Sequence, residues 1–290
     1  MRVLNRWMFF ACGFPRKYIL LEQMKWCISV LTRGYPENAS YSSLIKRNVA
    51  IHRHAYSHLA PLQLPDVVVF HEGNISGDQQ AYIQSHTPDM PLVFKSVEAE
   101  FPGAAGKMES KWCRATSLSD SFSIGYKHMC RFWFGTFFKY LEPYDYICRI
   151  DEDCFLREKT RCLYQCIKST SANYISACQM TWSDDPAVTM GIEALAKSEG
   201  FAGTISPPLP YTNFFIVDAK FYRASAEFQK WVRAVEESNG IYVNRWGDLP
   251  LWGMVLSCGI GSWCVDKRVI YDHDSHGLRL NDDGCDVARY

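Results

Sequence analysis

The stretch YICRIDEDCFL, residues 146–156, joins a short apolar run to three consecutive carboxylates, Asp151, Glu152 and Asp153. A run of this kind predicts a buried strand. In open α/β sheets, ligands bind at the carboxyl ends of the strands, where loops and helix N-termini converge. Asp151 and Asp153 are separated by one residue, so both can reach a single hard cation such as Mn²⁺ or Mg²⁺. The stretch predicts a metal site at a sheet edge, with a solvated acidic turn as the alternative.

Outward from this stretch, strand-like and helix-like segments alternate along the chain. Short apolar runs predict strands, and apolar residues at helical spacing predict helices. The expected strands are 25–32, 66–73, 91–97, 144–150, 173–180 and 211–219, and the expected helices are 36–58, 77–86, 117–141 and 220–235. This rhythm predicts an α/β fold with a mostly parallel sheet flanked by helices.

Composition narrows the class of protein. Hydrophobic residues make up 48% of the 290, enough for one large core, and 31 basic residues balance 31 acidic ones. The balance gives no global field for nucleic acid, so we expect no nucleic-acid partner. The twelve cysteines lack the paired spacing of a zinc site, which favours buried, reduced thiols over a disulfide framework.

The N-terminal segment, residues 1–24, has a basic start and a short apolar centre. It falls short of the roughly 18 to 20 apolar residues that a membrane helix needs. We therefore expect a lead-in without a stable membrane span, followed by a single domain over 25–290. Sequons at Asn38 and Asn74 matter only in a secretory compartment.

Three motifs carry a family resemblance: YKHMCRFWFG at 126–135, YDYICRIDED at 144–153 and NRWGDLPLWG at 244–253. In order and spacing they resemble glycosyltransferase family 15, the fungal-type α-1,2-mannosyltransferases. That family has Tyr-Arg-His-Met-Cys-Arg-Phe, Tyr-Asp-x-Tyr-Trp-Arg-Val-Glu-Pro-Asp and Glu-Arg-Trp-Gly-Asp-Ala-Pro. The resemblance covers roughly residues 110–280.

The resemblance implies a GT-A fold and transfer of mannose from GDP-mannose to a glycan or glycoconjugate hydroxyl, with retention. It also implies Mn²⁺, with Mg²⁺ as the alternative, and a Golgi or secretory location. The cytoplasm is expected instead if the absence of an anchor is real. Residues 25–157 would form the nucleotide-sugar-binding half and 158–290 the acceptor half, while the sequence leaves the oligomeric state open.

The resemblance also assigns the metal ligands. Asp151 stands where the family has its metal-binding Glu, and Asp153 matches the last Asp of that motif. A histidine near the C-terminus completes the family's site, and His276 is the expected counterpart, with His273 as its rival. Imidazole nitrogen and carboxylate oxygen are reasonable ligands for Mn²⁺.

Donor-binding residues are expected in three places. Thr32, Arg33 and Gly34 end the first strand, whose loop in a GT-A domain commonly lines the nucleoside pocket. Arg149 either holds the carboxylates or a phosphate, or forms an internal ion pair. The stretch that lies beside the donor in the family supplies three further candidates, namely Tyr126, His128 and Arg131.

The acceptor side is expected around Asp248. One explanation makes Asp248 the N-cap of a helix that Pro250 begins. The other has Asp248 bind the acceptor hydroxyl or assist its deprotonation, beside an aromatic sugar platform of Tyr211, Trp246 and Trp252.

One departure affects the chemistry. The family's Ser-Asn-Phe-Glu-Ile contains a candidate nucleophile, and the sequence TNFFI places Phe215 at that Glu. Three explanations stay open: transfer on one face of the sugar without a covalent intermediate, replacement by Asp218 or Asp248, or altered chemistry. A non-catalytic sugar-nucleotide-binding relative and a metal-dependent phosphohydrolase or nucleotidyltransferase are the rival functions.

Overall fold

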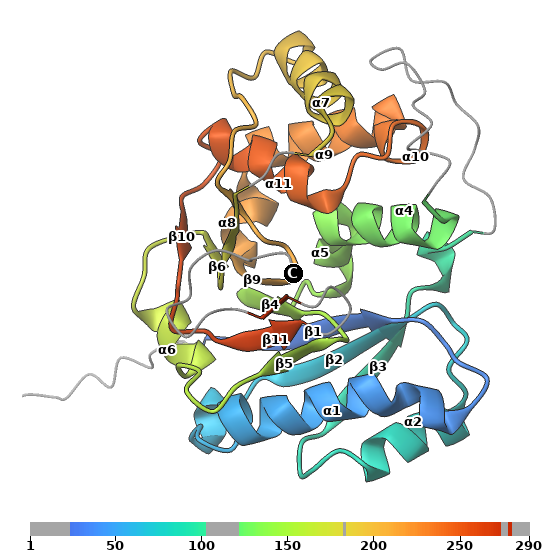
Figure 1. Ribbon diagram of the computed structural model, residues 1–290. Helices are drawn as coiled ribbons and strands as arrows, with labels where there is room; N and C mark the ends of the chain where they lie inside the picture. Colours follow the sequence, from blue (N-terminus) through green and yellow to red (C-terminus); the bar gives the residue numbers. More distant parts are fainter. Residues whose placement is uncertain (1–23, 103–121, 182–183, 274–277, 280–290) are drawn as a thin grey trace, which may run out of the picture.

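The structure, a computed structural model, describes residues 24–102, 122–181, 184–273 and 278–279. His276 and all but the last residue of the expected lead-in lie outside the described residues. A seven-stranded sheet with strand order β10-β6-β9-β4-β1-β2-β3 forms the centre (Figure 1).

The central sheet is mostly parallel. Within it only β9 runs antiparallel to its neighbours, β4 and β6, while β1 pairs in parallel with β2 and β4. The strands are β1 Trp26–Thr32, β2 Asp66–His71, β3 Leu92–Ser96, β4 Tyr146–Ile150, β6 Tyr174–Ser176, β9 Phe214–Asp218 and β10 Trp263–Val265. The expected α/β class is confirmed.

Helices cover both faces of this sheet (Figure 1). Successive strand residues point to opposite faces, so Cys27 and Ile28 of β1 enter different apolar clusters. One face packs against α1 Ser42–Ile51 and α6 Leu163–Lys168, with α2 Gly77–Ser85 nearby. The other packs against α4 Ile124–Arg131, α5 Phe137–Tyr140, α9 Ala226–Ser238 and α11 Asp248–Ser257.

Shorter elements complete the described chain. The remaining helices are α7 Pro186–Ser198, α8 Ala219–Ala224 and α10 Gly240–Val243, and a two-stranded sheet joins β7 Gln179–Met180 to β8 Leu209–Pro210. Single turns of 3-10 helix are η1 Asn38–Tyr41, η3 Pro61–Gln63 and η4 Glu98–Glu100, and π turns are η2 His52–Tyr56 and η5 Phe132–Thr136. The helix expected over 36–58 is therefore divided among η1, α1 and η2.

A small second sheet brings distant parts of the chain together. It consists of β5 Cys154–Leu156, β11 Tyr271–His273 and β12 Leu278–Arg279. β5 follows the carboxylates of 151–153 directly and pairs antiparallel with β11, so that His273 lies opposite Cys154. This register places a C-terminal histidine beside the acidic turn.

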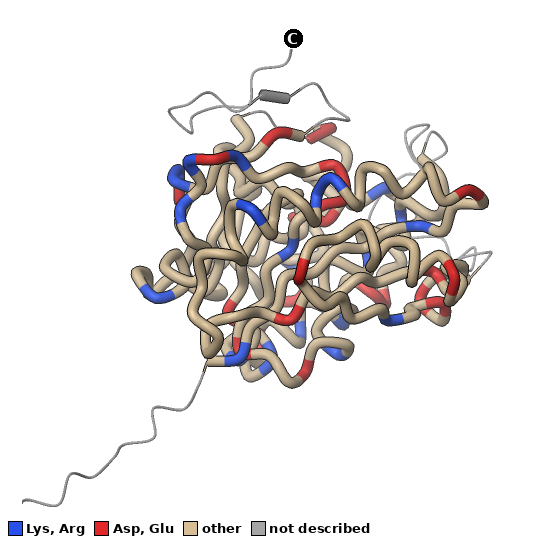
Figure 2. Tube along the Cα trace, turned by 90° about the horizontal axis from the view of Figure 1, so that it is seen from below, with Lys and Arg blue, Asp and Glu red and all other residues tan. Residues whose placement is uncertain are grey.

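The distribution of charged residues and the state of the described cysteines agree with the expectations from composition. Figure 2 shows basic and acidic residues interspersed along the described trace. The nine cysteines within the described ranges are free thiols, and six of them are buried. None of the described helices has both the length and the apolarity of a membrane span.

Candidate functional site

A cleft of about 530 Å³ opens where β1, β2 and β4 end, as expected for this class of sheet. Charged and aromatic side chains share its walls. The lining residues are Leu31, Arg33, Tyr35, Ser43, Glu72, Phe101, Ser123, Gly125, Tyr126, Met129, Trp133, Arg149, Asp151, Glu152 and Asp153.

Arg149 lies at the back of this cleft between two carboxylates. Its Nε is 2.6 Å from Oδ1 of Asp151 and its Nη2 3.0 Å from Oδ2, while Nη1 is 2.5 Å from Oδ2 of Asp248. Burial alone would lower the pKa of Arg149, but the two carboxylates raise it above its usual value. The structure shows Arg149 in ion pairs with both carboxylates.

Asp248 differs from its expected position as a helix cap. Gly247 is the N-cap of α11, and Asp248 is the first residue of the helix without a capping hydrogen bond. Its carboxylate turns inward to Arg149 and is almost fully buried. The prediction of an Asp248 cap was wrong, because the demand of a buried guanidinium outweighs that of the free amides at the helix end.

Asp218 lies far from this cleft along the sheet. It ends β9, which is antiparallel to β4, and it pairs with Tyr146 at the opposite end of that strand from Arg149. Its Oδ1 accepts a hydrogen bond from the backbone N–H of Phe221 at 3.0 Å and caps α8. The structure therefore does not bring Asp218 to the expected site.

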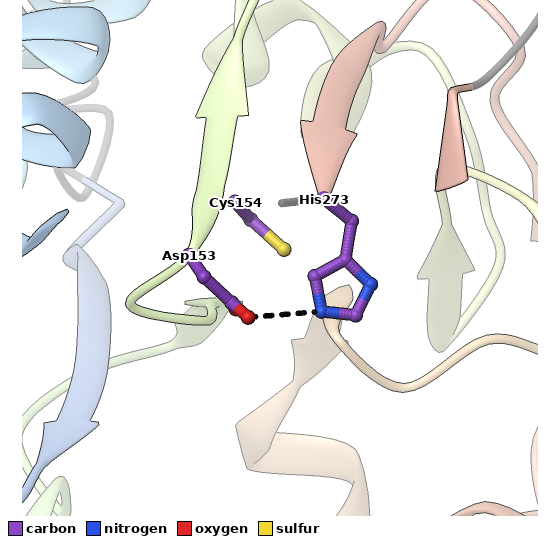
Figure 3. Close-up of side chains that lie close together, drawn as sticks. All are labelled: Asp153, Cys154 and His273. Carbon is purple, nitrogen blue, oxygen red and sulfur yellow. Dashed lines mark ion pairs between the residues drawn. The ribbon is translucent and has the colours of Figure 1, made fainter. Parts of the chain in front are cut away.

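Asp153 faces the second sheet instead of Arg149. Its Oδ2 lies 3.3 Å from Nε2 of His273. The Cys154 thiol, on β5, points toward His273 on β11 (Figure 3). The ligand atoms of these three residues lie within 4.8 Å of one another. Asn213 Nδ2 is 3.1 Å from Nδ1 of His273 and holds the far side of the ring. His273, the rival candidate, is thus the described histidine beside the acidic turn.

Glu152, between the two aspartates, binds the loop after β1. Its carboxylate accepts hydrogen bonds from Thr32 Oγ1 at 2.6 Å and from the Tyr35 hydroxyl at 3.3 Å. Burial raises the pKa of Glu152 above its ordinary value. Arg33 lines the cleft, whereas Thr32 is buried behind it and Gly34 packs against Asn74.

The expected donor residues on α4 divide in the same way. Tyr126 lines the cleft. His128 is buried, with Nδ1 2.8 Å from the Tyr242 hydroxyl and Nε2 2.8 Å from the carbonyl of Pro102. Arg131 points to another surface, where it pairs with Glu100 at 3.0 Å and Glu236 at 3.2 Å. The structure does not bring His128 or Arg131 to the cleft.

The expected aromatic platform is mostly core. Trp246 and Trp252 are fully buried, and Nε1 of Trp252 donates to the carbonyl of Trp133 at 3.2 Å. They cannot stack on a sugar, so that prediction was wrong for both tryptophans. Tyr211 is half-buried, with its ring centroid 6.1 Å from that of His273. Phe215 is buried under the Arg149 guanidinium, whose central carbon lies 5.7 Å from the centroid of the Phe215 ring.

Arg47 is a site-supporting residue that sequence reasoning missed. It is fully buried on α1, and Nε donates to the carbonyl of Ile150 at 2.9 Å while Nη2 donates to that of Ser29 at 3.2 Å. Burial lowers its pKa to about 10. Its position between Leu44 and Ile51 on the apolar stripe of α1 was the available signal.

Comparisons with known proteins agree with this architecture. The chain matches no protein-family model. It is 24% identical over 173 residues to the O-glycoside alpha-1,2-mannosyltransferase omh1 of Schizosaccharomyces pombe, a match that covers 52% of this chain and 44% of omh1. The chain thus spans less than half of the length of that curated relative.

Two solved structures share the fold. The mannosyltransferase Ktr4p from S. cerevisiae superposes with a TM-score of 0.70 at 17% identity, covering 89% of this chain and 72% of Ktr4p. Core-mannan synthase A (CmsA/Ktr4) from Aspergillus fumigatus, solved in an Mn/GDP form, gives 0.66 at 16% identity, covering 87% and 75%. The expected GT-A fold is confirmed, and with it the resemblance of this chain to the Ktr4-type mannosyltransferases of glycosyltransferase family 15.

Proposed function

We propose that this protein is a metal-dependent glycosyltransferase that transfers mannose from GDP-mannose to a hydroxyl of a glycan or glycoconjugate. The observation that carries the proposal is the Asp153–His273 pair at the edge of the strand-end cleft. The solved relative in an Mn/GDP form, which has the same fold, supports this choice of metal and nucleotide.

The residues of the pair fit Mn²⁺ better than Mg²⁺, because Mg²⁺ prefers oxygen ligands alone. A carboxylate oxygen and an imidazole nitrogen suit Mn²⁺, whereas thiolates select softer metals. Burial and the neighbouring aspartates raise the pKa of the Cys154 thiol above its ordinary value. Asp153 and His273 would hold the cation, which when bound would neutralise charge on the leaving diphosphate.

The remaining candidate residues for donor binding lie on two walls of the cleft. Arg33 and Tyr35 lie on the β1 side, and Tyr126 lies on the α4 side. We assign the nucleoside to the Arg33 and Tyr35 wall, since a tyrosine ring can pack against a base and a guanidinium can meet a phosphate. Arg149 stays with Asp151 and Asp248, and its role is to fix the strand end.

We further infer that transfer proceeds on one face of the sugar without a covalent enzyme intermediate. Phe215 offers no nucleophile, Asp218 caps a helix at the other end of the sheet, and Asp248 is buried against Arg149. Neither Asp218 nor Asp248 is among the described residues that line the cleft. This favours the first of the three explanations for the Phe215 departure.

For the compartment, we propose the secretory lumen. Both sequon asparagines, Asn38 and Asn74, are exposed and open to a glycosylating enzyme. Expression in a eukaryotic host followed by endoglycosidase treatment tests this: a gel shift that is lost in Asn38→Gln and Asn74→Gln variants supports luminal exposure. An unshifted full-length chain in that host would favour the cytoplasm.

A donor screen tests the activity. Purified protein is incubated with a panel of nucleotide sugars, with and without Mn²⁺, and released nucleoside diphosphate is measured. We expect release of GDP from GDP-mannose only with the metal, and much less with Asp153→Asn. Absence of turnover together with absence of stabilisation by any donor would overturn the enzyme assignment.

A further inference from the structure

Glu152 lies between the two aspartates but contacts a different part of the molecule. Its two carboxylate oxygens accept hydrogen bonds from the last residue of β1, Thr32 Oγ1 at 2.6 Å, and from the segment after it, the Tyr35 hydroxyl at 3.3 Å. Glu152, Tyr35 and the intervening Arg33 all line the cleft. The acidic turn and the β1 loop, residues 32–35, are thus joined across the cleft floor.

On the side opposite Glu152, the β1 loop is held by hydrogen bonds to its backbone. The Tyr35 N–H donates to the Tyr41 hydroxyl at 3.0 Å, and Gln79 Nε2 donates to the Tyr35 carbonyl at 2.7 Å. Gly34 packs so closely that a β-carbon there would lie within 2.5 Å of the Asn74 carbonyl oxygen. The turn η1 and helix α2 therefore fix the outer side of the loop, and Glu152 fixes its side chains on the cleft side.

We propose that Glu152 is a positioning residue that ties the β1 loop to the acidic turn and so holds the nucleoside wall of the cleft in place. The proposal rests on the proposed function for the identity of the ligand. The family motif quoted above has proline at this position, which offers no side-chain acceptor, so the tie is a feature of this chain.

Two substitutions separate the tie from a simple effect of charge. Glu152→Gln removes the negative charge, but its amide oxygen still accepts from one hydroxyl and its NH2 group can donate to the oxygen of the other, so both contacts of the tie can persist. Glu152→Ala removes both. If Glu152 acted only through its charge, either change would strengthen binding of the anionic GDP, because a repulsion is lost. If it acts as a tie, the alanine variant binds GDP more weakly and the glutamine variant stays near the parent.

The first measurement needs no ligand. Hydrogen–deuterium exchange of the peptide over 31–37 is compared in the parent, Glu152→Ala and Glu152→Gln, with Tyr35→Phe as the matched variant on the other side of the tie. We expect faster exchange in Glu152→Ala and in Tyr35→Phe, and near-parental exchange in Glu152→Gln. Unchanged exchange in Glu152→Ala, with the rest of the protein folded, would overturn the proposal.

The second measurement is the affinity for GDP in EDTA, beside the affinity for Mn²⁺ without nucleotide. We expect Glu152→Ala to weaken GDP binding about tenfold, the effect of one lost hydrogen bond to a charged group. We expect Mn²⁺ affinity to change less than about twofold, since a tie to the loop leaves Asp153 in place. Tighter GDP binding, or equal losses in the alanine and glutamine variants, would overturn the tie. A parent that binds no GDP would contradict the proposed function, whereas the exchange result stands without it.

Discussion

Asp151 and Asp153 are two residues apart on one turn, yet their surroundings differ. Asp151 forms a two-point ion pair with Arg149, which also holds Asp248. Asp153 faces His273 across the pairing of β5 with β11. Asp151 therefore neutralises the buried guanidinium of Arg149, while Asp153 lies beside His273 at the cleft edge.

The difference teaches that a D-x-D spacing does not make two equal metal ligands. A carboxylate that already accepts two charge-assisted hydrogen bonds has little left to offer an ion. A carboxylate beside an imidazole has a second metal ligand at hand. We expect Asp151 to contribute mainly to stability and Asp153 mainly to metal binding.

The largest expected effect is on stability, at Arg149. Arg149→Met leaves the Asp248 carboxylate buried without its partner, which costs about 3–5 kcal/mol of unfolding free energy. Urea unfolding followed by circular dichroism measures this. The control is Arg157→Met, since Arg157 pairs with Asp272 where both side chains are about one-third exposed, and such pairs contribute less than about 1 kcal/mol. Equal losses in both variants would show that the Arg149 network is not the anchor of the strand end.

The comparison between the two aspartates is tested by metal affinity. We expect Asp153→Asn to weaken Mn²⁺ binding in the presence of GDP by at least about tenfold, because one charged ligand is lost. His273→Ala should weaken it as well, since His273 is the second proposed ligand. Isothermal titration provides the constants. Asp151→Asn with a larger loss of affinity than Asp153→Asn would reverse the assignment.

A pH prediction concerns the second ion-pair network, around Glu100. Burial would raise the pKa of Glu100, but hydrogen bonds from Lys139, Tyr140 and Arg131 lower it below its usual value. A lowered folded-state pKa stabilises the protein above the unfolded value of about 4.3, and this contribution is lost as the pH falls through the lower folded value. Glu100→Gln should therefore destabilise by about 1 kcal/mol at neutral pH. If the deficit in unfolding free energy is as large at pH 3 as at pH 7, the ionised carboxylate is not its source.

The smallest expected effect is at Arg131. Arg131→Gln should leave GDP affinity within about twofold of the parent, because Arg131 pairs with Glu100 and Glu236 away from the cleft. Arg33→Gln, on the cleft wall, serves as the matched comparison and should weaken GDP binding. A strong loss in Arg131→Gln alone would restore its expected place among the donor-binding residues.

Local patterns predicted the scaffold well. The apolar runs around Cys27, Val68 and Cys148 identified β1, β2 and β4, and the general rule for open sheets placed the cleft at their ends. Lys127 and Arg131 lie one turn apart on α4, and both bind other parts of the protein. Spacing along one helix says which residues are neighbours, but not which neighbour the face meets.

Long-range pairing decided what the sequence left open. His273 reaches Asp153 only because β11 pairs with β5, which lies more than 100 residues earlier in the chain. Trp246 and Trp252 are residues of the type that packs against sugars, but burying their large apolar surface in the core is more favourable than exposing it at a site. The buried partner of Asp248 was equally invisible, since Arg149 is 99 residues away.

The most direct test is the position of the metal ion. Crystals grown with Mn²⁺ and GDP would be measured at a wavelength where manganese scatters anomalously. We predict one strong anomalous peak in contact with Asp153 and His273, with Arg149 still paired to Asp151 and Asp248. A peak bound by Asp151, with Arg149 displaced and His273 turned away, would contradict the division of roles between the two aspartates.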